Sequence, residues 1–128
     1  MIRVKRIYDP LEESDGKRIL VDRLWPRGVS QEKAAIHEWM KEVAPSHELR
    51  ERFHQHGNLD EFEESYRKEL MGDDSKILIL KQLQKWSDEG TVTLLYSAKD
   101  KERNQAVILA EIVRGMDQVE NTSGPSSS

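Results

Sequence analysis

Two short polar segments of the sequence carry the residue types that could bind or transform a ligand. The first follows the apolar run Ile19–Val21 and supplies a carboxylate, two arginines, an indole and a glycine: Asp22, Arg23, Trp25, Arg27 and Gly28. The second follows Val92–Leu95 and supplies hydroxyl, amide and charged groups: Tyr96, Ser97, Lys99, Asp100 and Asn104. Because guanidinium groups bind carboxylates and phosphates through paired hydrogen bonds, the two segments predict a site for a small anion.

Chemistry at such a site would follow from the charges that surround the anion. Arg23, Arg27 and Lys99 would hold the ligand, and Asp22 or Asp100 could orient an arginine or act as a base. Gly28 would let the backbone approach closely, and the Trp25 indole could stack on a ring. Binding without catalysis would give the same residue types, so the sequence leaves open whether the protein is an enzyme.

The same residues also suit a purely structural role. Arg23 could pair with a neighbouring carboxylate, Trp25 with Pro26 could form a packed corner, and Asp100 could cap the last helix. None of the histidines has the spacing of a metal site. Among them, His54 is of interest because it shares a helical stripe with Arg50.

The elements that must position these residues are predicted from apolar patterns. Three successive apolar residues at Ile19–Val21 indicate a strand that is covered on both faces and therefore central, and Val92–Leu95 indicates a second one. The alternation over residues 2–8 is typical of an edge strand. If the two central strands are adjacent and parallel, their carboxyl ends bring both polar segments to one place, where ligands bind in such sheets.

Helices are predicted between and after these strands. The expected starts are Ser30, Ser46, Asn58 and Asp73 or Asp74, and the expected stops are Gly57, Gly72 and Gly90, with Gly90 in a left-handed conformation. Residues 34–43 repeat apolar side chains at helical spacing without a clear start. The last helix is expected over residues 102–114, ending at Gly115. Only about eight residues join the first two strands, so that pair could be antiparallel or use a compressed connection.

The order of these elements predicts an α/β fold: a single small layered domain over residues 1–115, with a largely parallel, short sheet and helices on both faces. Residues 116–128 are small and polar and are expected to form a disordered tail. The chain of 128 residues has no cysteine, which excludes a thiolate metal site or nucleophile. With no signal peptide or membrane span in the sequence, we expect a cytoplasmic protein.

The charge distribution leaves one alternative function. A net charge of −4 argues against general affinity for nucleic acid or anionic membranes, yet residues 1–35 hold eight Lys or Arg against six Asp or Glu. A nucleic-acid-binding or regulatory module could use this basic third, with Trp25 as a stacking residue. No known nucleic-acid, nucleotide, hydrolase or zinc-protease motif is present, and the sequence indicates no particular cofactor or oligomeric state.

Several long segments resemble the YeaO-like proteins, a bacterial domain-of-unknown-function family, from Ile2 to about Val113. The matching segments are KRIYDP at residues 5–10, SDGKRILVDRLWPRG at residues 14–28, EW-x-KE-x-APS at residues 38–46, ELR at residues 48–50 and LLYSAKD at residues 94–100. The resemblance implies a small α/β fold with a pocket near the WPRG and SAKD loops, and it assigns no catalytic residue. A longer related group carries a cysteine-containing loop and a Cys-His-Arg segment. This chain has neither, so a thiol mechanism does not apply.

Overall fold

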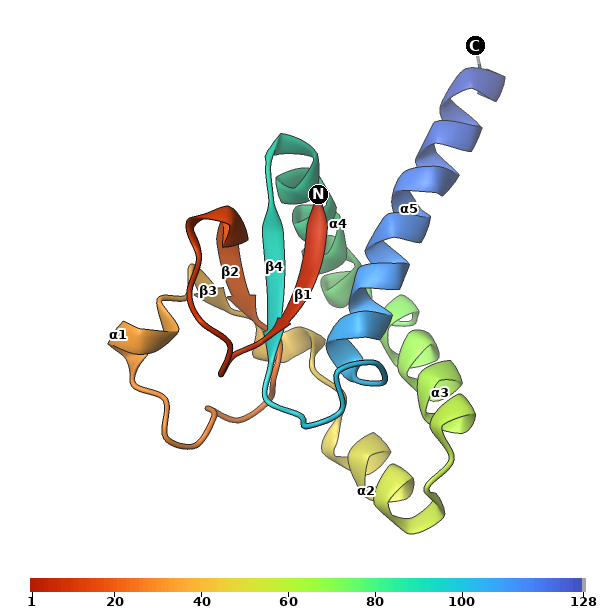
Figure 1. Cartoon of the computed structure of the whole chain (residues 1–128). Coiled ribbons are helices and arrows are strands. Elements are labelled where there is room, and N and C mark those ends of the chain that lie inside the picture. The colour runs from red at the N-terminus through yellow and green to blue at the C-terminus, as the bar shows by residue number, and fades with distance from the viewer. Residues whose placement is uncertain (128) are drawn as a thin grey trace.

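The protein is built on one sheet of four parallel strands in the order β1-β4-β2-β3 (Figure 1). The computed structural model describes the backbone of residues 1–127 and the side chains of residues 1–116. The strands are β1 Ile2–Arg6, β2 Lys17–Leu20, β3 Glu38–Trp39 and β4 Val92–Tyr96. Because β4 pairs in parallel with β2, and Ile19 lies opposite Leu94, the prediction of two adjacent, parallel, central strands is confirmed.

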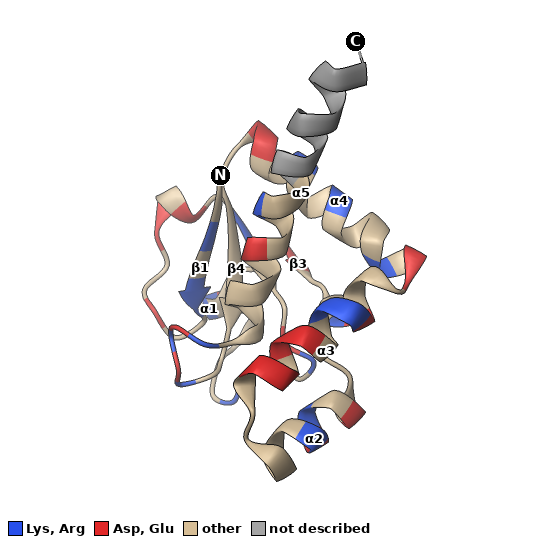
Figure 2. Cartoon of the chain, turned by 90° about the vertical axis from the view of Figure 1, so that its right-hand side faces the viewer, with Lys and Arg blue, Asp and Glu red and all other residues tan. Residues whose placement is uncertain are grey.

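Helices cover the two faces of the sheet unequally. On one face lie the long helices α3 Leu59–Met71, α4 Asp74–Glu89 and α5 Gln105–Ser127, while α2 His47–His56 lies beyond the carboxyl ends of the strands (Figures 1 and 2). The other face is covered by the β1–β2 connection with its 3-10 turn η1 Glu13–Asp15, and by the one-turn helix α1 Gln31–Ala34. The predicted α/β fold is therefore confirmed.

The apolar residues of β2 explain why it is central. Ile19 and Val21 face the large core beneath the long helices, while Leu20 faces a smaller cluster with Leu95 and Ala34 on the opposite side. Ile19, Leu20 and the following Val21 are all fully buried. Burying both faces of one strand requires cover on both sides, which the three-residue apolar run predicted.

The connection between β1 and β2 is compressed, and it crosses the sheet on the face of the smaller cluster. Both strands run parallel to β4, which lies between them, so the antiparallel alternative does not occur. The connection is tied to the sheet by the buried Asp15 carboxylate, which accepts hydrogen bonds from Lys5 at 3.0 Å and from Arg18 at 2.5 Å. The Asp15 carbonyl also accepts a 2.7 Å hydrogen bond from Thr93 of β4. These bonds replace the helix that a longer crossover would use.

Side-chain caps form at the helix starts that the sequence predicted. Ser30, Ser46, Asn58 and Asp73 each accept a hydrogen bond from a backbone N–H in the first turn of α1, α2, α3 and α4. Gly57 ends α2 with φ +63°, a left-handed stop as expected. Gly90 differs, because its φ of −177° is extended backbone, and the prediction of a left-handed stop there is wrong.

Residues 34–43 contain the strand that the sequence did not predict. The helical spacing of Ile36, Trp39, Met40 and Val43 is misleading, because the segment forms the two-residue strand β3 and the 3-10 turn η2 Lys41–Val43. β3 pairs only with β2, placing Glu38 opposite Ile19 and Trp39 opposite Leu20. A strand this short has no alternation from which it could be recognised.

Several element ends also differ from prediction. β1 ends at Arg6 rather than Tyr8, and β2 ends at Leu20, one residue before the end of the apolar run Ile19–Val21. α5 begins at Gln105, and its bounds run beyond Gly115, the predicted end. The expected disordered tail at residues 116–128 stays a prediction, because all but its first residue lie outside the described side chains. Among the described residues, no helix is both long and apolar enough to cross a membrane.

Candidate functional site

Asp22, which follows the end of β2, lies at the centre of the candidate site. Its side chain accepts a 2.9 Å hydrogen bond from the Ser97 backbone N–H after β4, and another from the Gln105 amide in the first turn of α5. The Asp22 carbonyl accepts a 2.7 Å bond from the Trp39 indole. One carboxyl group therefore joins the ends of the two central strands to the start of α5.

Burial gives the Asp22 carboxyl unusual acid–base properties. Asp22 is only 8 % exposed, and this loss of contact with water raises the pKa of its carboxyl above the usual value for aspartate. Hydrogen bonds from Ser97 and Gln105 and the positive charge of Arg50 oppose the shift without cancelling it. A buried carboxyl with a raised pKa can exchange a proton closer to neutral pH than an exposed one.

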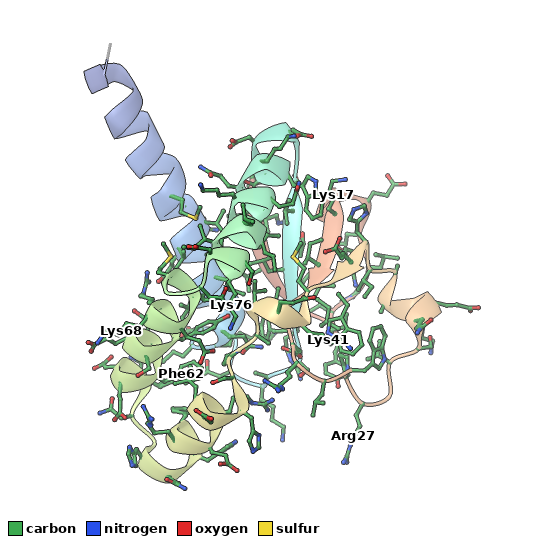
Figure 3. The ribbon with its side chains drawn as sticks, turned by 180° about the vertical axis from the view of Figure 1, so that it is seen from behind. Lys17, Arg27, Lys41, Phe62, Lys68 and Lys76 are labelled. Carbon is green, nitrogen blue, oxygen red and sulfur yellow. The ribbon has the colours of Figure 1, made fainter. Side chains whose placement is uncertain are left out.

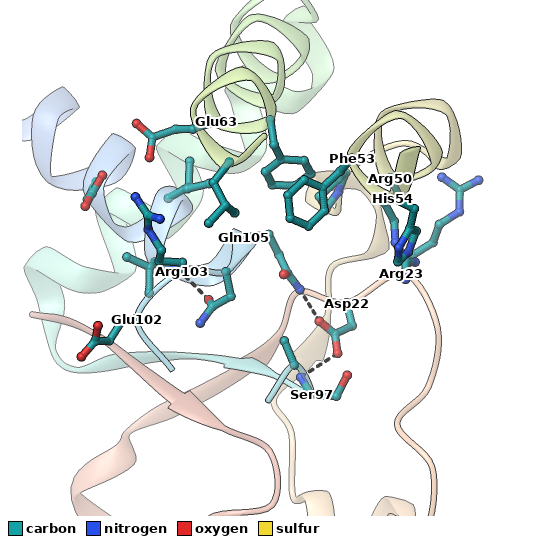
Figure 4. Close-up of a pocket in the computed structure, with 18 of the residues that line it drawn as sticks. Asp22, Arg23, Arg50, Phe53, His54, Glu63, Ser97, Glu102, Arg103 and Gln105 are labelled. Carbon is teal, nitrogen blue, oxygen red and sulfur yellow. Dashed lines mark hydrogen bonds between the residues drawn. The ribbon is translucent and has the colours of Figure 1, made fainter. Parts of the chain in front are cut away.

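Asp22 lines a pocket of about 480 Å³ beyond the carboxyl ends of β2 and β4 (Figure 4). Its walls come from α2, α3 and the first turns of α5, and its volume is in the range that accommodates metabolite-sized ligands. The site is therefore where the topology predicted it, at the carboxyl end of the central strands.

Positive side chains gather at the end of the pocket nearest α2. Figure 4 shows Arg23, Arg50 and His54 together beside Asp22. Arg50 and His54 are four residues apart on α2, so they lie on one face of that helix. Within the described part of the chain, no ion pair or hydrogen bond involves the guanidinium group of Arg23 or Arg50. Both arginines line the pocket, and the charge of Arg50 acts at a distance on the Asp22 carboxyl.

Apolar side chains form the middle of the pocket. Phe53 of α2 and Phe62 of α3 pack with their ring centroids 5.1 Å apart, and both are only partly buried. Leu59, Val107 and Ile108 complete this part of the wall. Both phenylalanines therefore offer apolar ring surface to the pocket.

The end of the pocket between α3 and α5 is acidic. Glu63 of α3 and Glu111 of α5 line it, and Arg67 bridges them at 3.5 and 3.0 Å. Glu102 and Arg103 lie nearby, at the same end of the pocket as Glu63 in Figure 4. Figure 2 shows acidic positions on both α3 and α5 where these helices run side by side. The pocket is thus polarised, with cations at one end and an excess of acids at the other.

Four of the residues that the sequence selected line this pocket, two from each polar segment: Asp22, Arg23, Ser97 and Asn104. Asn104 has a structural task as well, because its side-chain oxygen accepts a 3.0 Å hydrogen bond from the Val107 N–H and so caps α5. The sequence had offered Asp100 for that cap.

The other predicted residues of the first segment lie outside the pocket. Trp25 donates a 2.6 Å hydrogen bond to the Val29 carbonyl and packs edge-on against Trp39, so the packed-corner alternative describes it. Arg27 projects away from the domain (Figure 3), and Gly28 beside it is exposed with φ +74°. The structure does not bring these three residues into the pocket that Arg23 lines, because Trp25 packs against the smaller core cluster while Arg27 and Gly28 are exposed.

Of the second polar segment, only Ser97 and Asn104 line the pocket, while Tyr96, Lys99 and Asp100 lie outside it. Tyr96 is buried in the core, and Lys99 is exposed outside the pocket lining. Asp100 accepts backbone hydrogen bonds from Glu102 and Arg103 at 2.9 and 3.0 Å, which fold the turn before α5. These bonds lower the pKa of the Asp100 carboxyl. Lys99 and Asp100 are therefore not part of the cavity, contrary to the prediction.

Sequence reasoning missed the contribution of α2 and of Gln105. The one signal for α2 was the shared stripe of Arg50 and His54, which the structure places on the pocket wall. Nothing in the local sequence marks Gln105, because its role depends on where α5 begins relative to Asp22. The described residues contain no group of three His, Asp or Glu side chains that could hold a metal ion.

The chain is similar over most of its length to several uncharacterised bacterial proteins. The chain is 45 % identical to the uncharacterised protein YeaO of Escherichia coli strain K12 over 118 residues, which cover 90 % of this chain and 98 % of the relative. It is 38 % identical over 115 residues to Mb3100c of Mycobacterium bovis and to Rv3073c of Mycobacterium tuberculosis, covering 89 % of this chain and 94 % of each relative. No solved structure matches significantly.

A family model matches the whole chain, residues 1–128, and is described as the inactive DUF488-N3 subclade. The resemblance to the YeaO-like proteins that the sequence indicated is thereby confirmed. The chain belongs to the inactive DUF488-N3 subclade, with the YeaO-like proteins among its relatives.

Proposed function

We propose that the protein binds a small metabolite carrying a carboxylate or phosphate group, with Arg23, Arg50 and His54 around the negative charge. The observation that supports this most directly is the convergence of two arginines, neither of them in an ion pair or hydrogen bond among the described residues, at one end of a 480 Å³ pocket. Guanidinium groups left free at a concave site are suited to a planar or tetrahedral anion. Arg23 was among the residues predicted from the sequence. Arg50 supplies the second positive charge, which the sequence had assigned to Arg27 and Lys99.

Asp22 has a positioning role in this proposal. Its carboxyl group is held by Ser97 and Gln105, and it lies in the field of Arg50. A fixed carboxyl beside an arginine limits the directions in which that guanidinium can point. The proposal covers binding and specifies no reaction, in keeping with the description of the subclade as inactive. As the sequence led us to expect, we place this binding in the cytoplasm, which cell fractionation would check.

A thermal-shift assay of the full chain tests the proposal. Benzoate and phenyl phosphate serve as anionic probes beside a panel of carboxylated and phosphorylated metabolites. A ligand at ten times its Kd stabilises the native state by about 1.4 kcal/mol, which raises the Tm of a domain of this size by about 5 °C. We expect such a rise for the wild type and its loss in Arg23→Ala and Arg50→Ala.

Two variants serve as matched controls. Arg52→Ala removes an exposed arginine of the same helix that lies outside the pocket, and Lys99→Ala removes a predicted cation that the cavity does not include. Both should keep the ligand-induced rise in Tm. The proposal is wrong if no anion stabilises the wild type, or if Arg52→Ala and Arg50→Ala lose the rise equally.

A further inference from the structure

The pocket is too large for a bare anion. One water molecule accounts for about 30 Å³ of liquid, so a free phosphate or carboxylate would leave most of the 480 Å³ unfilled. Arg23, Arg50 and His54 also lie together at the α2 end of the pocket. If the anionic group lies there, the rest of the ligand must extend along the wall toward α3 and α5.

The wall along which it would extend is aromatic. Phe53 and Phe62 lie 5.1 Å apart between centroids, with their planes inclined at 49°, and both line the cavity. Neither ring is fully buried by the protein itself, in contrast to Tyr66, which is 0 % exposed one turn further along α3. Two partly exposed rings beside Leu59 and Ile108 give a surface on which a planar apolar group loses contact with water.

The far end of the pocket selects against a second negative charge. Glu63 and Glu111 share the single guanidinium of Arg67, so their two charges are only half compensated. Glu102 and Arg103 lie at the same end. Three carboxylates therefore face two guanidinium groups there, which leaves an excess of one negative charge. A ligand with anionic groups at both ends would meet like charge there, which costs binding energy.

We infer that the ligand is an aromatic compound with one anionic group: an aryl carboxylate or aryl phosphate monoester whose ring packs on Phe53 and Phe62, and whose far end carries no second anion. This inference rests on the proposed function, because it takes the Arg23–Arg50–His54 end as the anion site. Beyond the anion site, the inference specifies that the ligand is aromatic and that the pocket rejects related molecules with a second anionic group.

Titration calorimetry with three carboxylates separates these features. Acetate tests the anion alone, 4-methylbenzoate adds the ring, and terephthalate adds a second carboxylate across the ring. We expect 4-methylbenzoate to bind about tenfold more tightly than acetate, because the ring buries apolar area against two phenylalanines. Terephthalate should bind about fivefold more weakly than 4-methylbenzoate, the size of effect that partly exposed charges produce.

Variants at the acidic end give the decisive comparison. Glu63→Gln should remove the penalty on terephthalate while leaving the affinity for 4-methylbenzoate nearly unchanged. Glu64→Gln is the matched control, because Glu64 sits next to Glu63 on α3, forms an equivalent ion pair with Lys68 and lies outside the pocket. Glu64→Gln should leave the ratio of the two affinities as in the wild type.

The outcomes distinguish this inference from the function on which it rests. If acetate binds as tightly as 4-methylbenzoate and both are lost in Arg50→Ala, the anion site stands and the aromatic ligand is refuted. Terephthalate binding as tightly as 4-methylbenzoate refutes the selection against a second anion. If none of the three carboxylates nor phenyl phosphate binds, the inference and the anion site fail together.

Discussion

Two buried aspartates of this protein show how the environment of a residue decides the role of a carboxylate. Asp15 and Asp22 are 0 % and 8 % exposed, and burial alone would raise the pKa of both. For Asp15, hydrogen bonds from Lys5, the Glu12 backbone and Arg18 outweigh burial and lower the pKa. For Asp22, burial prevails and the pKa is raised. The first carboxylate therefore stabilises the fold in its ionised form, and the second does not.

Replacing Asp15 should be strongly destabilising. Asp15→Asn leaves Arg18 without a counter-charge in a buried position and leaves Lys5 with only the exposed Glu12, and breaking such a buried pair costs about 3 kcal/mol or more. Denaturant unfolding at neutral pH would measure the loss. Glu13→Gln, an exposed neighbour in η1, should change the free energy of unfolding by no more than about 0.5 kcal/mol. A similar small effect of Asp15→Asn would mean that the network contributes nothing.

The effect of Asp15 should also depend on pH in a defined direction. A carboxyl whose folded pKa lies below its unfolded value of 3.8 adds stability that is fully present above pH 4. That contribution is lost as the pH falls through the folded pKa. The difference between wild type and Asp15→Asn should therefore stay constant from neutral pH down to about pH 4 and shrink below it.

Asp22 predicts the opposite behaviour. Because its folded pKa is raised, ionisation of Asp22 costs folding free energy, and that cost grows as the pH rises from 3.8 through the folded pKa. Asp22→Asn keeps an acceptor for the Ser97 N–H, and the Gln105 amide can turn its oxygen to the new amide. We expect the variant to be at least as stable as the wild type at neutral pH, with the gain vanishing below pH 4. Lower stability at neutral pH would show that the ionised carboxylate supports the fold.

At the scale of elements, predictions succeeded where the signal lies within a single segment. The caps Ser46 and Asn58 and the stop at Gly57 depend on hydrogen bonds that reach at most four residues along the chain. The central position of β2 follows from burial on both of its faces, which the three successive apolar residues Ile19–Val21 indicate. β3 could not be predicted, because a two-residue edge strand exists only through its pairing with β2.

Only part of the site could be predicted, because only part of it depends on residues whose position follows from neighbouring elements. Asp22 and Ser97 follow the ends of adjacent parallel strands, so topology alone brings them together. Arg50 and Phe53 reach the pocket because α2 lies across that end of the sheet, which depends on the path of the chain after η2. Arg27 and Lys99 were assigned to the site because the loops were assumed to converge, whereas Arg27 projects away from the domain (Figure 3) and Lys99 is exposed outside the pocket lining.

The turn into β2 gives a test at the scale of an element. Gly16 has φ +63° and ψ −129°, and a Cβ on this residue would overlap the Thr91 carbonyl, to which Lys17 donates a 3.0 Å hydrogen bond. Gly16→Ala must therefore push β2 from β4, and we expect a loss of about 3 kcal/mol. Gly57 has the same φ but open space around it, so Gly57→Ala should cost only about 1 kcal/mol. Equal losses in chemical denaturation would refute a steric origin.

At the scale of the whole molecule, three of the eight Lys and Arg residues in residues 1–35 have partners inside the fold. Lys5 and Arg18 pair with the buried Asp15. Arg6 donates to the carbonyls of Ser97 and Ala98, at 3.2 and 2.9 Å, and its guanidinium also lies 4.8 Å from the centre of the Tyr8 ring. The excess of positive charge in the sequence therefore does not form a free basic face.

Because several N-terminal cations have partners inside the fold, we predict that the protein does not bind nucleic acid. Neutralising phosphates along a duplex or single strand needs several exposed cations on one surface, and affinity then falls steeply as salt rises. Here three cations of the N-terminal third are engaged internally, Trp25 is packed against Trp39 instead of being open for stacking, and the net charge is −4. We expect no retention on heparin at physiological ionic strength and no shift of single- or double-stranded DNA or RNA at low salt. Retention that weakens with a steep salt dependence, and that is reduced in Arg27→Ala but not in Arg50→Ala, would show instead that the exposed loop around Arg27 binds a phosphate backbone.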